Sequence, residues 1–128
     1  MRPVMPRSVL IVDDHSGFRT MARAALEAEG FDVVGEAGDG READRMAADM
    51  RPDVVLLDVQ LPDVDGFVVA RRLLARAEPP VVVLISTRDA ADYGARIATS
   101  GAAGFIQKAR LSGDTLRATL AGRGGTPT

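Results

Sequence analysis

Five apolar runs alternate with segments of helical periodicity along this chain, and that alternation limits the possible folds more than any other feature. Three of the runs are nearly continuous Val, Leu and Ile, which is typical of central parallel strands covered on both faces. Strands that alternate with helices favour a parallel sheet joined by right-handed crossovers. The sequence therefore predicts a (βα)₅ α/β domain, with strands at 8–13, 32–36, 53–58, 81–86 and 104–107.

The segments between these runs carry the spacing of amphipathic helices. In the first segment, Phe18, Met21 and Ala22 recur at intervals that place them on one helical face. Glycines and prolines mark where such helices end, and a serine is a suitable N-cap for the last one. We expect helices from about residue 18 to before Gly30, over about 41–50, from near Asp65 to before Pro79, over about 89–100, and from Ser112 onward.

Five strands favour the doubly wound, flavodoxin-like strand order 2-1-3-4-5. In this order the first and third strands are neighbours at the point where the strand order reverses. The chain has 128 residues, 46% of them hydrophobic, which is enough for one core. We divide it into an N-terminal extension at 1–7, one domain at 8–121 and a flexible tail at 122–128.

Composition and charge exclude several classes of protein. The formal net charge of -2 gives no reason to expect a nucleic-acid or membrane surface. The absence of cysteine excludes a disulfide framework and a thiolate metal site. No segment approaches the roughly 20 apolar residues of a membrane span, and the stretch from Val9 to Val12 is too short for a signal-peptide core. We therefore expect a cytoplasmic protein.

Polar side chains stand where the strand-like runs end. Asp13 and Asp14 follow the first run, and Asp58 closes the third. Ser86 closes the fourth run, and Lys108 follows the fifth. In an open parallel sheet, ligands bind at the carboxyl ends of the strands, near the reversal of strand order. We therefore expect these five side chains to converge on one shallow crevice.

The charges of this group favour a divalent metal and a phosphoryl group. Three clustered aspartates repel one another, and Lys108 offsets one charge, so a formal charge of -2 remains for Mg²⁺ to balance. Asp14 and Asp58 are candidate direct ligands, a backbone carbonyl just after Asp58 is a third, and Asp13 would act through a water. An aspartate can also attack phosphorus and form an acyl phosphate. Lys108, the metal, and Ser86 or backbone N–H groups after Asp58 would hold the phosphoryl oxygens.

These residues, in this order, resemble the receiver domain of bacterial two-component response regulators, the CheY-like family. The resemblance covers the chain from Ser8 to about Ala121, and its motifs are highly specific only in combination. The stretch 33–40 is similar to receivers of the LuxR-type helix-turn-helix subgroup, although the chain ends before any DNA-binding domain. The matching motifs are VLIVDDH at 9–15, DVVLLD at 53–58, LPDVDG at 61–66, Ser86 and Lys108.

The resemblance implies a phosphoacceptor and a metal site. Asp58 corresponds to the residue that is phosphorylated. Asp13 and Asp14 correspond to the acidic pair that binds Mg²⁺ (or Mn²⁺), and Gln60 stands where the family supplies a backbone carbonyl ligand. We therefore expect metal ligation by these four residues.

The resemblance also implies a switch. Ser86 corresponds to a hydroxyl that moves toward the phosphoryl group, Lys108 to the lysine that pairs with it, and Phe105 to an aromatic rotamer switch. Gln60 and Arg88 flank the expected path of attacking water. Because both side chains are long, we expect slow self-hydrolysis of the acyl phosphate.

The function implied is a stand-alone receiver and not an enzyme, since it assists only its own phosphorylation and slow dephosphorylation. A histidine kinase or phosphotransfer protein would donate the phosphoryl group. The domain, a monomer or weak phosphorylation-dependent dimer, would then bind an unknown downstream protein, without direct contact to nucleic acid or membrane. Ala109 stands where many receivers have a proline in a cis peptide, and we expect a cis bond between Lys108 and Ala109 despite a cost of about 3–4 kcal/mol.

Alternatives remain open at this point. The chain could be the receiver portion of a truncated DNA-binding regulator, or a phosphate-independent interaction module. A haloacid-dehalogenase-type phosphatase has a second aspartate where this chain has Gln60, and a dinucleotide-binding domain needs a G-x-G-x-x-G motif that is absent. We expect His15 to be an exposed residue at a helix start, and Phe105 is equally explained as core. The fourth helix has few large apolar residues and should pack lightly.

Overall fold

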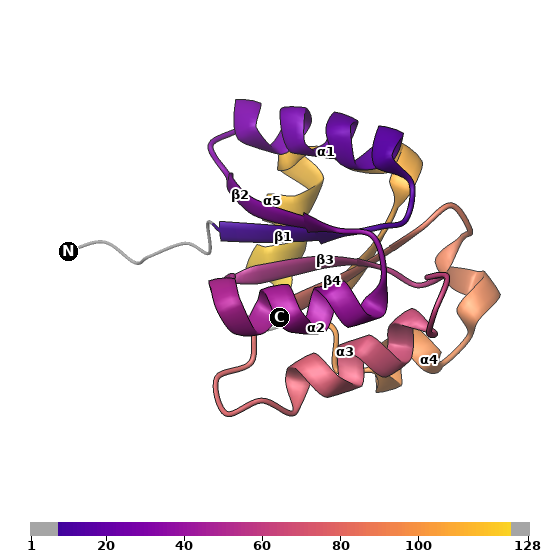
Figure 1. The fold of residues 1–128 in the computed structure, drawn as a ribbon. Helices are drawn as coiled ribbons and strands as arrows, with labels where there is room; N and C mark the ends of the chain where they lie inside the picture. The colour runs from indigo at the N-terminus through magenta and orange to yellow at the C-terminus, as the bar shows by residue number, and fades with distance from the viewer. Residues whose placement is uncertain (1–7, 124–128) are drawn as a thin grey trace.

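The structure is a computed structural model that describes residues 8–123, and within them one parallel sheet forms the centre of the molecule (Figure 1). Its strands pair in the order β2-β1-β3-β4-β5. The predicted (βα)₅ fold and strand order are therefore confirmed. The strands are β1 (Ser8–Val12), β2 (Asp32–Ala37), β3 (Val54–Asp58), β4 (Val81–Ser86) and β5 (Gly104–Gln107).

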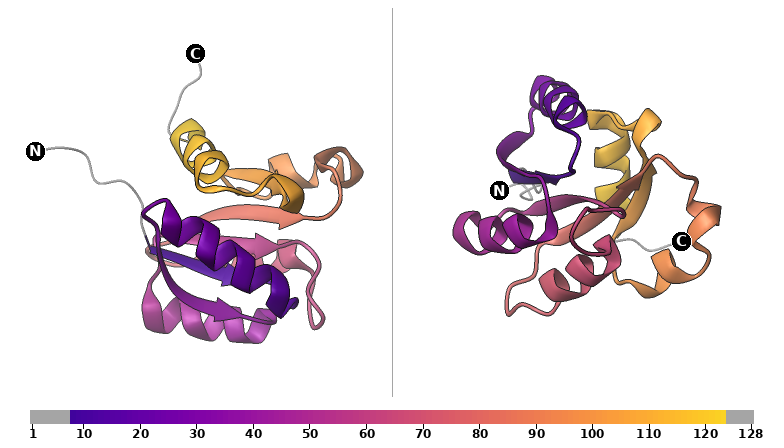
Figure 2. Two further views of the ribbon diagram at one scale, coloured as in Figure 1. Left: turned by 90° about the horizontal axis from the view of Figure 1, so that it is seen from above. Right: turned by 45° about the vertical axis from the view of Figure 1, so that its right-hand side comes forward.

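Helices cover both faces of this sheet. Helices α1 and α5 lie on one face, and α2 and α3 lie on the other (Figure 2). Two short 3₁₀ turns, η1 and η2, precede α4 and α5. The bounds are α1 (Ser16–Ala28), α2 (Gly40–Met50), α3 (Gly66–Leu74), η1 (Ala90–Tyr93), α4 (Arg96–Thr99), η2 (Lys108–Arg110) and α5 (Gly113–Arg123).

The two faces of the sheet contribute to two separate hydrophobic layers. Successive side chains of a strand point to opposite faces, so Val9 and Ile11 pack toward α1 and α5 while Leu10 and Val12 pack toward α2 and α3. All four side chains are fully buried. This explains why the strand sequences are continuously apolar instead of alternating.

The helix ends follow the predicted signals. Gly30, after α1, has a φ of 94°, which is the left-handed conformation that favours glycine. The Asp65 carboxylate accepts a hydrogen bond from the N–H of Phe67 and caps α3. The Ser112 hydroxyl accepts one from the N–H of Thr115 and caps α5, as expected.

The predicted single helix at about 89–100 is wrong. The segment is divided into η1 and α4, and Gly94 lies between them with a φ of 56°. A residue in this conformation cannot continue a right-handed helix. Neither η1 nor α4 contains a buried residue, in a stretch that the structure describes completely. The light packing expected for this segment is therefore observed, and it leaves little to enforce a continuous helix.

The expected cis bond between Lys108 and Ala109 is also wrong, because every peptide bond among residues 8–123 is trans. The 3₁₀ turn η2 begins at Lys108 and is closed by a hydrogen bond from the N–H of Leu111 to the Lys108 carbonyl, 3.2 Å long. This turn aims the lysine side chain without the cost of about 3–4 kcal/mol for a cis bond before alanine.

The last helix extends slightly beyond the predicted C-terminal boundary of the domain. Helix α5 continues through Arg123, past the expected boundary at Ala121. The expected N-terminal extension (1–7) and the remainder of the expected tail (124–128) lie outside the described residues. Every helix among residues 8–123 is too short or too polar to cross a bilayer.

Candidate functional site

Two buried carboxylates form the base of the site, and the local backbone aims both of them. Asp13 follows β1 and is fully buried, and its Oδ1 accepts a 2.8 Å hydrogen bond from the N–H of His15. Asp58 ends β3 and is 3% exposed, and its Oδ1 accepts a 3.0 Å bond from the N–H of Gln60. Since β1 and β3 are paired neighbours, the two side chains meet at the carboxyl edge of the sheet.

Lys108 places one positive charge against these two carboxylates. Its ammonium contacts Oδ2 of Asp13, and it lies 3.1 Å from Oδ2 of Asp58. The same Nζ lies 4.8 Å from the ring centre of Phe18, which adds a cation–π contact. Asp13, Asp58 and Phe18 thus all contact the ammonium group, just after the end of β5. Its side chain is only 10% exposed, so Lys108 is not a solvated surface lysine.

Burial and charge perturb both titrating partners. Burial raises the pKa of Asp58, and the charge of Asp13 raises it further, while the N–H of Gln60 and the ammonium of Lys108 act against this. Burial alone would lower the pKa of Lys108, but its contacts with Asp13 and Asp58 outweigh burial and raise it. Lys108 is therefore a permanent cation beside Asp58 at neutral pH.

Asp14 and His15 complete the acidic end of the site from its exposed side. Nδ1 of His15 lies 3.1 Å from Oδ1 of Asp13 and 3.1 Å from Oδ1 of Asp14. As expected, the imidazole is exposed at the start of α1. Its approach to both aspartates is a feature that sequence reasoning missed.

The donor set fits a hard divalent cation. Asp13, Asp14, His15 and Asp58 each offer a ligand atom, and these atoms all lie within 4.8 Å of one another. Oδ2 of Asp13 is buried and contacts the ammonium of Lys108. Carboxylate oxygens are the protein ligands that Mg²⁺ prefers.

Asp14 and Asp58 border a hollow of about 310 Å³, whereas the buried Asp13 is not among its lining residues. Thr87, Leu61 and Pro62 belong to its wall although sequence reasoning did not select them. Gln60 also lines it, whereas Ser86 and Arg88 are not among its lining residues. The hollow is lined by Asp14, His15, Asp58, Gln60, Leu61, Pro62, Thr87 and Lys108.

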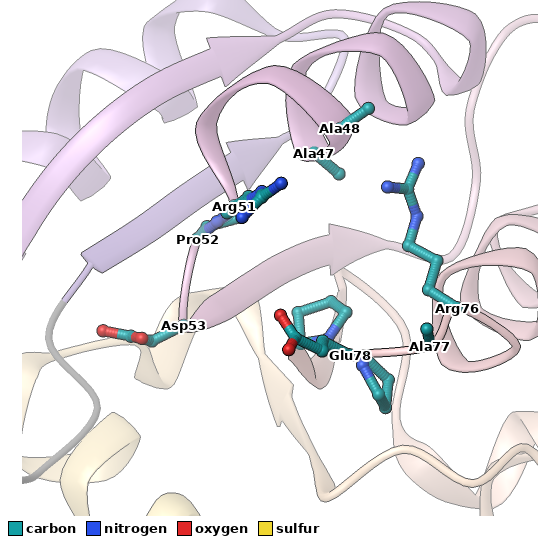
Figure 3. Close-up of a pocket in the computed structure, with 10 residues that line it drawn as sticks. Ala47, Ala48, Arg51, Pro52, Asp53, Arg76, Ala77 and Glu78 are labelled. Carbon is teal, nitrogen blue, oxygen red and sulfur yellow. The ribbon is translucent and has the colours of Figure 1, made fainter.

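A larger hollow, of about 790 Å³, lies elsewhere in the molecule. Figure 3 shows the side chains of Arg51, Arg76 and Glu78 around it. Asp53, in its wall, directly precedes β3, whereas Asp58 is the last residue of the same strand. The larger hollow is therefore at the opposite end of the strand and does not include the carboxylate site.

Ser86 reaches the correct edge of the sheet, but its hydroxyl has other partners. The residue is 1% exposed, and its Oγ accepts a 3.0 Å hydrogen bond from the N–H of Arg88. The same Oγ lies 2.6 Å from the hydroxyl of Tyr93. Phe105 is half-buried, and its ring centre lies 6.0 Å from that of Tyr93. Sequence reasoning missed Tyr93 as a member of this group.

An arginine pair supports the site from α1. Nη1 of Arg19 donates a 2.6 Å hydrogen bond to the backbone carbonyl of Asp13, and its Nε donates to Glu36 at 3.1 Å. Nε of Arg23 donates to the other oxygen of Glu36 at 2.7 Å. The hydrogen bond from Arg23 is the main reason why the pKa of Glu36 is lowered. The four-residue spacing of the arginines was the available sequence signal, since it places them on one helical face.

The loop between β3 and α3 explains the LPDVDG motif in structural terms. The Asp63 carboxylate accepts hydrogen bonds from the N–H groups of Gly40 (2.8 Å) and Arg41 (3.1 Å), and so ties the loop to the start of α2. The N–H of Gly66 donates to the carbonyl of Val59 at 2.7 Å. A Cβ at Gly66 would collide with the carbonyl oxygen of Asp58, so this position requires glycine.

Comparison with known proteins identifies the family. A family model described as "Response regulator receiver domain" matches residues 9–121. The chain therefore belongs to the receiver domain family of two-component response regulators. Receiver domains in general bind Mg²⁺ at an acidic pocket, and the structure of this chain has an acidic cluster of Asp13, Asp14 and Asp58.

Individual relatives agree with this assignment. The chain is 38% identical over 102 residues to the response regulator GacA of Pseudomonas aeruginosa, covering 78% of this chain and 47% of GacA. It spans about half or less of the length of the curated relatives that it matches. One of these, a protein-glutamate methylesterase/protein-glutamine glutaminase of Alkalilimnicola ehrlichii, is 39% identical over 109 residues, covering 82% of this chain and 28% of that protein.

Solved receiver structures share the fold. The signal receiver domain of NarL from Mycobacterium tuberculosis superposes with a TM-score of 0.82 at 34% identity, covering 96% of this chain and 100% of that domain. The chemotaxis response regulator CheY4 of Vibrio cholerae superposes with a TM-score of 0.78 at 29% identity, covering 94% of this chain and 99% of CheY4. The resemblance inferred from the motifs is confirmed.

Proposed function

We propose that Asp58 accepts a phosphoryl group from a histidine kinase or phosphotransfer protein in a Mg²⁺-dependent reaction in the cytoplasm. The observation that carries the proposal is the position of the Asp58 carboxylate. It borders a polar hollow between an acidic pair and a buried ammonium. A carboxylate with no such neighbours has no means to balance the charge of an incoming phosphoryl group.

The transfer is a displacement at phosphorus. A carboxylate oxygen of Asp58 forms a bond to phosphorus as the bond from phosphorus to the donor breaks. With a phosphohistidine donor, the bond that breaks joins phosphorus to a ring nitrogen, and that nitrogen leaves with the bonding electrons. With acetyl phosphate, acetate leaves. The product in both cases is an acyl phosphate on Asp58.

Asp13, Asp14 and Asp58 would hold the metal ion, with the backbone carbonyl of Gln60 as a further ligand. The bound ion, Mg²⁺ or Mn²⁺, supplies positive charge next to the transferring phosphoryl oxygens. Asp13 is fixed for this task by the N–H of His15 and by the bond from Arg19 to its carbonyl. These two bonds hold Asp13 in place without a bound ligand.

Lys108 neutralises charge before and after the transfer. In the present structure its ammonium is shared between Asp13 and Asp58. An acyl phosphate on Asp58 moves the negative charge outward from the carboxylate to the phosphoryl oxygens. Lys108 would follow this charge and form an ion pair with one of those oxygens, because its raised pKa keeps it cationic.

Ser86, Gln60 and Arg88 would set the lifetime of the product. The Ser86 hydroxyl would donate a hydrogen bond to a phosphoryl oxygen. Gln60, from the wall of the hollow, and Arg88 would hinder the approach of water and slow hydrolysis. Phe105 would change rotamer in the same transition. The domain would thus assist only its own phosphorylation and slow dephosphorylation, and its output would be altered binding to a downstream protein.

Intact mass spectrometry after incubation with acetyl phosphate tests this proposal. We expect one phosphoryl adduct with Mg²⁺ and none after removal of metal with a chelator. Asp58→Asn should give no adduct, whereas the matched control Asp49→Asn, an exposed aspartate on α2, should react as the parent does. An adduct that persists in Asp58→Asn would contradict the assignment of the phosphoacceptor.

A further inference from the structure

We propose that Tyr93 is a positioning residue for Ser86, and that its hydroxyl competes with the phosphoryl group on Asp58 for the Ser86 hydroxyl. The inference rests on the proposed phosphorylation of Asp58 and deepens it. It assigns a role to a residue outside the phosphoacceptor hollow, on the 3₁₀ turn η1.

The first argument is the set of hydrogen bonds at Ser86. A serine hydroxyl has one hydrogen to donate and two lone pairs to accept with. The N–H of Arg88 occupies one lone pair at 3.0 Å, and the 2.6 Å contact with Tyr93 is the remaining side-chain bond. Both partners hold the hydroxyl outside the hollow that Asp58 borders. The observed rotamer is therefore the one that Tyr93 stabilises.

The second argument is the distance that the hydroxyl must move. Side-chain rotamers are separated by about 120°, so a change at χ1 moves a serine oxygen by about 2 Å. A 2.6 Å hydrogen bond to Tyr93 does not survive such a displacement unless the tyrosine follows. Recruitment of Ser86 by a phosphoryl oxygen therefore releases the hydroxyl of Tyr93.

The third argument is that Tyr93 lies within a row of rings. Its ring centre lies 5.7 Å from that of Phe67 on α3, at an interplanar angle of 66°. On the other side it lies 6.0 Å from the ring of Phe105 on β5, at 55°. Tyr93 thus links α3, η1 and β5, and a change in its position is passed to both neighbouring rings.

The fourth argument is the weak attachment of the segment that carries Tyr93. Among residues 90–99, all within the described part of the chain, no residue of η1 or α4 is buried. Side-chain contacts attach the segment instead. Besides the hydrogen bond between the Tyr93 and Ser86 hydroxyls, Arg96 donates to Asp65 at 2.7 Å and stacks 4.2 Å from the ring centre of Phe67. Loss of the bond to Ser86 removes one of these few attachments.

A kinetic consequence follows for the acyl phosphate. Tyr93→Phe keeps the ring and removes the competing hydroxyl, so Ser86 becomes free to bind the phosphoryl group. The net free energy of one hydrogen bond changes an equilibrium constant by a factor of about two to ten. We expect the acyl phosphate of Tyr93→Phe to last longer by about that factor. In a Ser86→Ala background the same substitution should have no effect, which a purely structural role of the tyrosine would not predict.

The composition of the chain provides a direct probe. Tyr93 is the only tyrosine, and the chain contains no tryptophan. Protein labelled with 3-fluorotyrosine therefore gives one ¹⁹F resonance, which reports the surroundings of this ring. The experiment records the resonance of the full chain before and after addition of acetyl phosphate and Mg²⁺, with the intact mass of the same sample. Unphosphorylated Ser86→Ala supplies the position expected for the released tyrosine.

If the inference is correct, the adduct forms and the ¹⁹F resonance moves toward its position in Ser86→Ala. An adduct with an unchanged resonance would overturn the role of Tyr93 and leave the phosphorylation of Asp58 intact. The absence of an adduct in the mass spectrum would overturn the proposed function, and this inference with it. An equal effect of Tyr93→Phe on the lifetime with and without Ser86 would also overturn the inference.

Discussion

The two sides of the carboxylate site at Asp13 and Asp58 are built in different ways. On the side of β1 and β3, every residue of β3 is buried, and backbone N–H groups aim both Asp13 and Asp58. On the side between β4 and β5, η1 and α4 bury no residue, and side-chain contacts from Tyr93 and Arg96 attach them. The first side therefore fixes the two carboxylates, and the second side is attached to the sheet by fewer contacts.

The two sides should therefore differ in the free energy at which they open. Regions with few buried contacts open at low free energy, while core strands open only with the whole domain. A small change at Ser86, at the border of the two sides, is therefore expected to alter η1 and α4 before it alters the sheet. The predictions below separate the two sides from the largest expected effect to the smallest.

The largest contrast should come from matched truncations of apolar side chains. Leu56→Ala, in the middle of β3, should lower the free energy of unfolding by about 2–5 kcal/mol, because it leaves a cavity in a fully buried layer. Ile97→Ala on α4 should cost less than about 1 kcal/mol, because that side chain is only partly buried. Urea denaturation measures both. Equal losses in the free energy of unfolding would contradict the proposed difference in packing between the two sides.

A second contrast concerns glycines. In Gly66→Ala the new Cβ would collide with the backbone carbonyl of Asp58 and lie 2.7 Å from Cα of Val59, and neither atom can yield easily. We expect a loss of about 1–3 kcal/mol, together with slower phosphorylation, because the backbone that carries Asp58 must shift. Gly17→Ala on α1 is the control, since no heavy atom lies within 4 Å of its Cβ. It should be neutral or stabilising by up to about 1 kcal/mol in thermal unfolding.

Asp58 itself should be a source of instability. Its pKa is raised by burial, so the ionised carboxylate is held at an energetic cost in the folded state. Asp58→Asn removes that charge and should stabilise the fold at pH 7 by about 0.5–2 kcal/mol. The gain should shrink as the pH falls through the folded pKa, and vanish below the unfolded pKa, where the parent carboxyl is also neutral. A destabilised Asp58→Asn at pH 7 would contradict this reasoning.

Glu36 should show the opposite sign with a smaller magnitude. Its pKa is lowered by hydrogen bonds from Arg23 and Arg19, so its ionised form contributes stability above the unfolded pKa. Glu36→Gln should cost about 0.5–1 kcal/mol at neutral pH, a modest value because the group is partly exposed and screened by solvent. The difference should disappear as the pH falls through the folded pKa of Glu36. Urea titrations of both proteins at several pH values test this, and a difference that does not depend on pH would contradict it.

The sequence was sufficient to predict the rigid side of the molecule. The apolar runs that end in Asp13 and Asp58 are buried on both faces, and such runs form strands with few alternatives. Strand order then brings the two aspartates together, and Lys108 follows because β5 ends at the same edge. In this region burial and strand order determine where these side chains lie. Both can be inferred from the pattern of residue types along the chain.

The other side was predicted less well, for a physical reason. Between Asp89 and Ser100 little apolar surface is available to bury, so one glycine with a positive φ was enough to divide the expected helix. The hydrogen bond between the Tyr93 and Ser86 hydroxyls depends on that division, since it needs the geometry of η1. The trans peptide after Lys108 likewise depends on the turn η2, which residue types alone do not specify.

Amide hydrogen exchange, read by peptide mass, tests the division between the two sides most directly. The unphosphorylated protein should exchange rapidly across residues 90–99 and slowly across β1 and β3. After treatment with acetyl phosphate and Mg²⁺, the account predicts a change concentrated between Ser86 and Thr99, with β1 and β3 unchanged. Protection of η1 and α4 equal to that of β3, or a change spread evenly over the sheet, would contradict it.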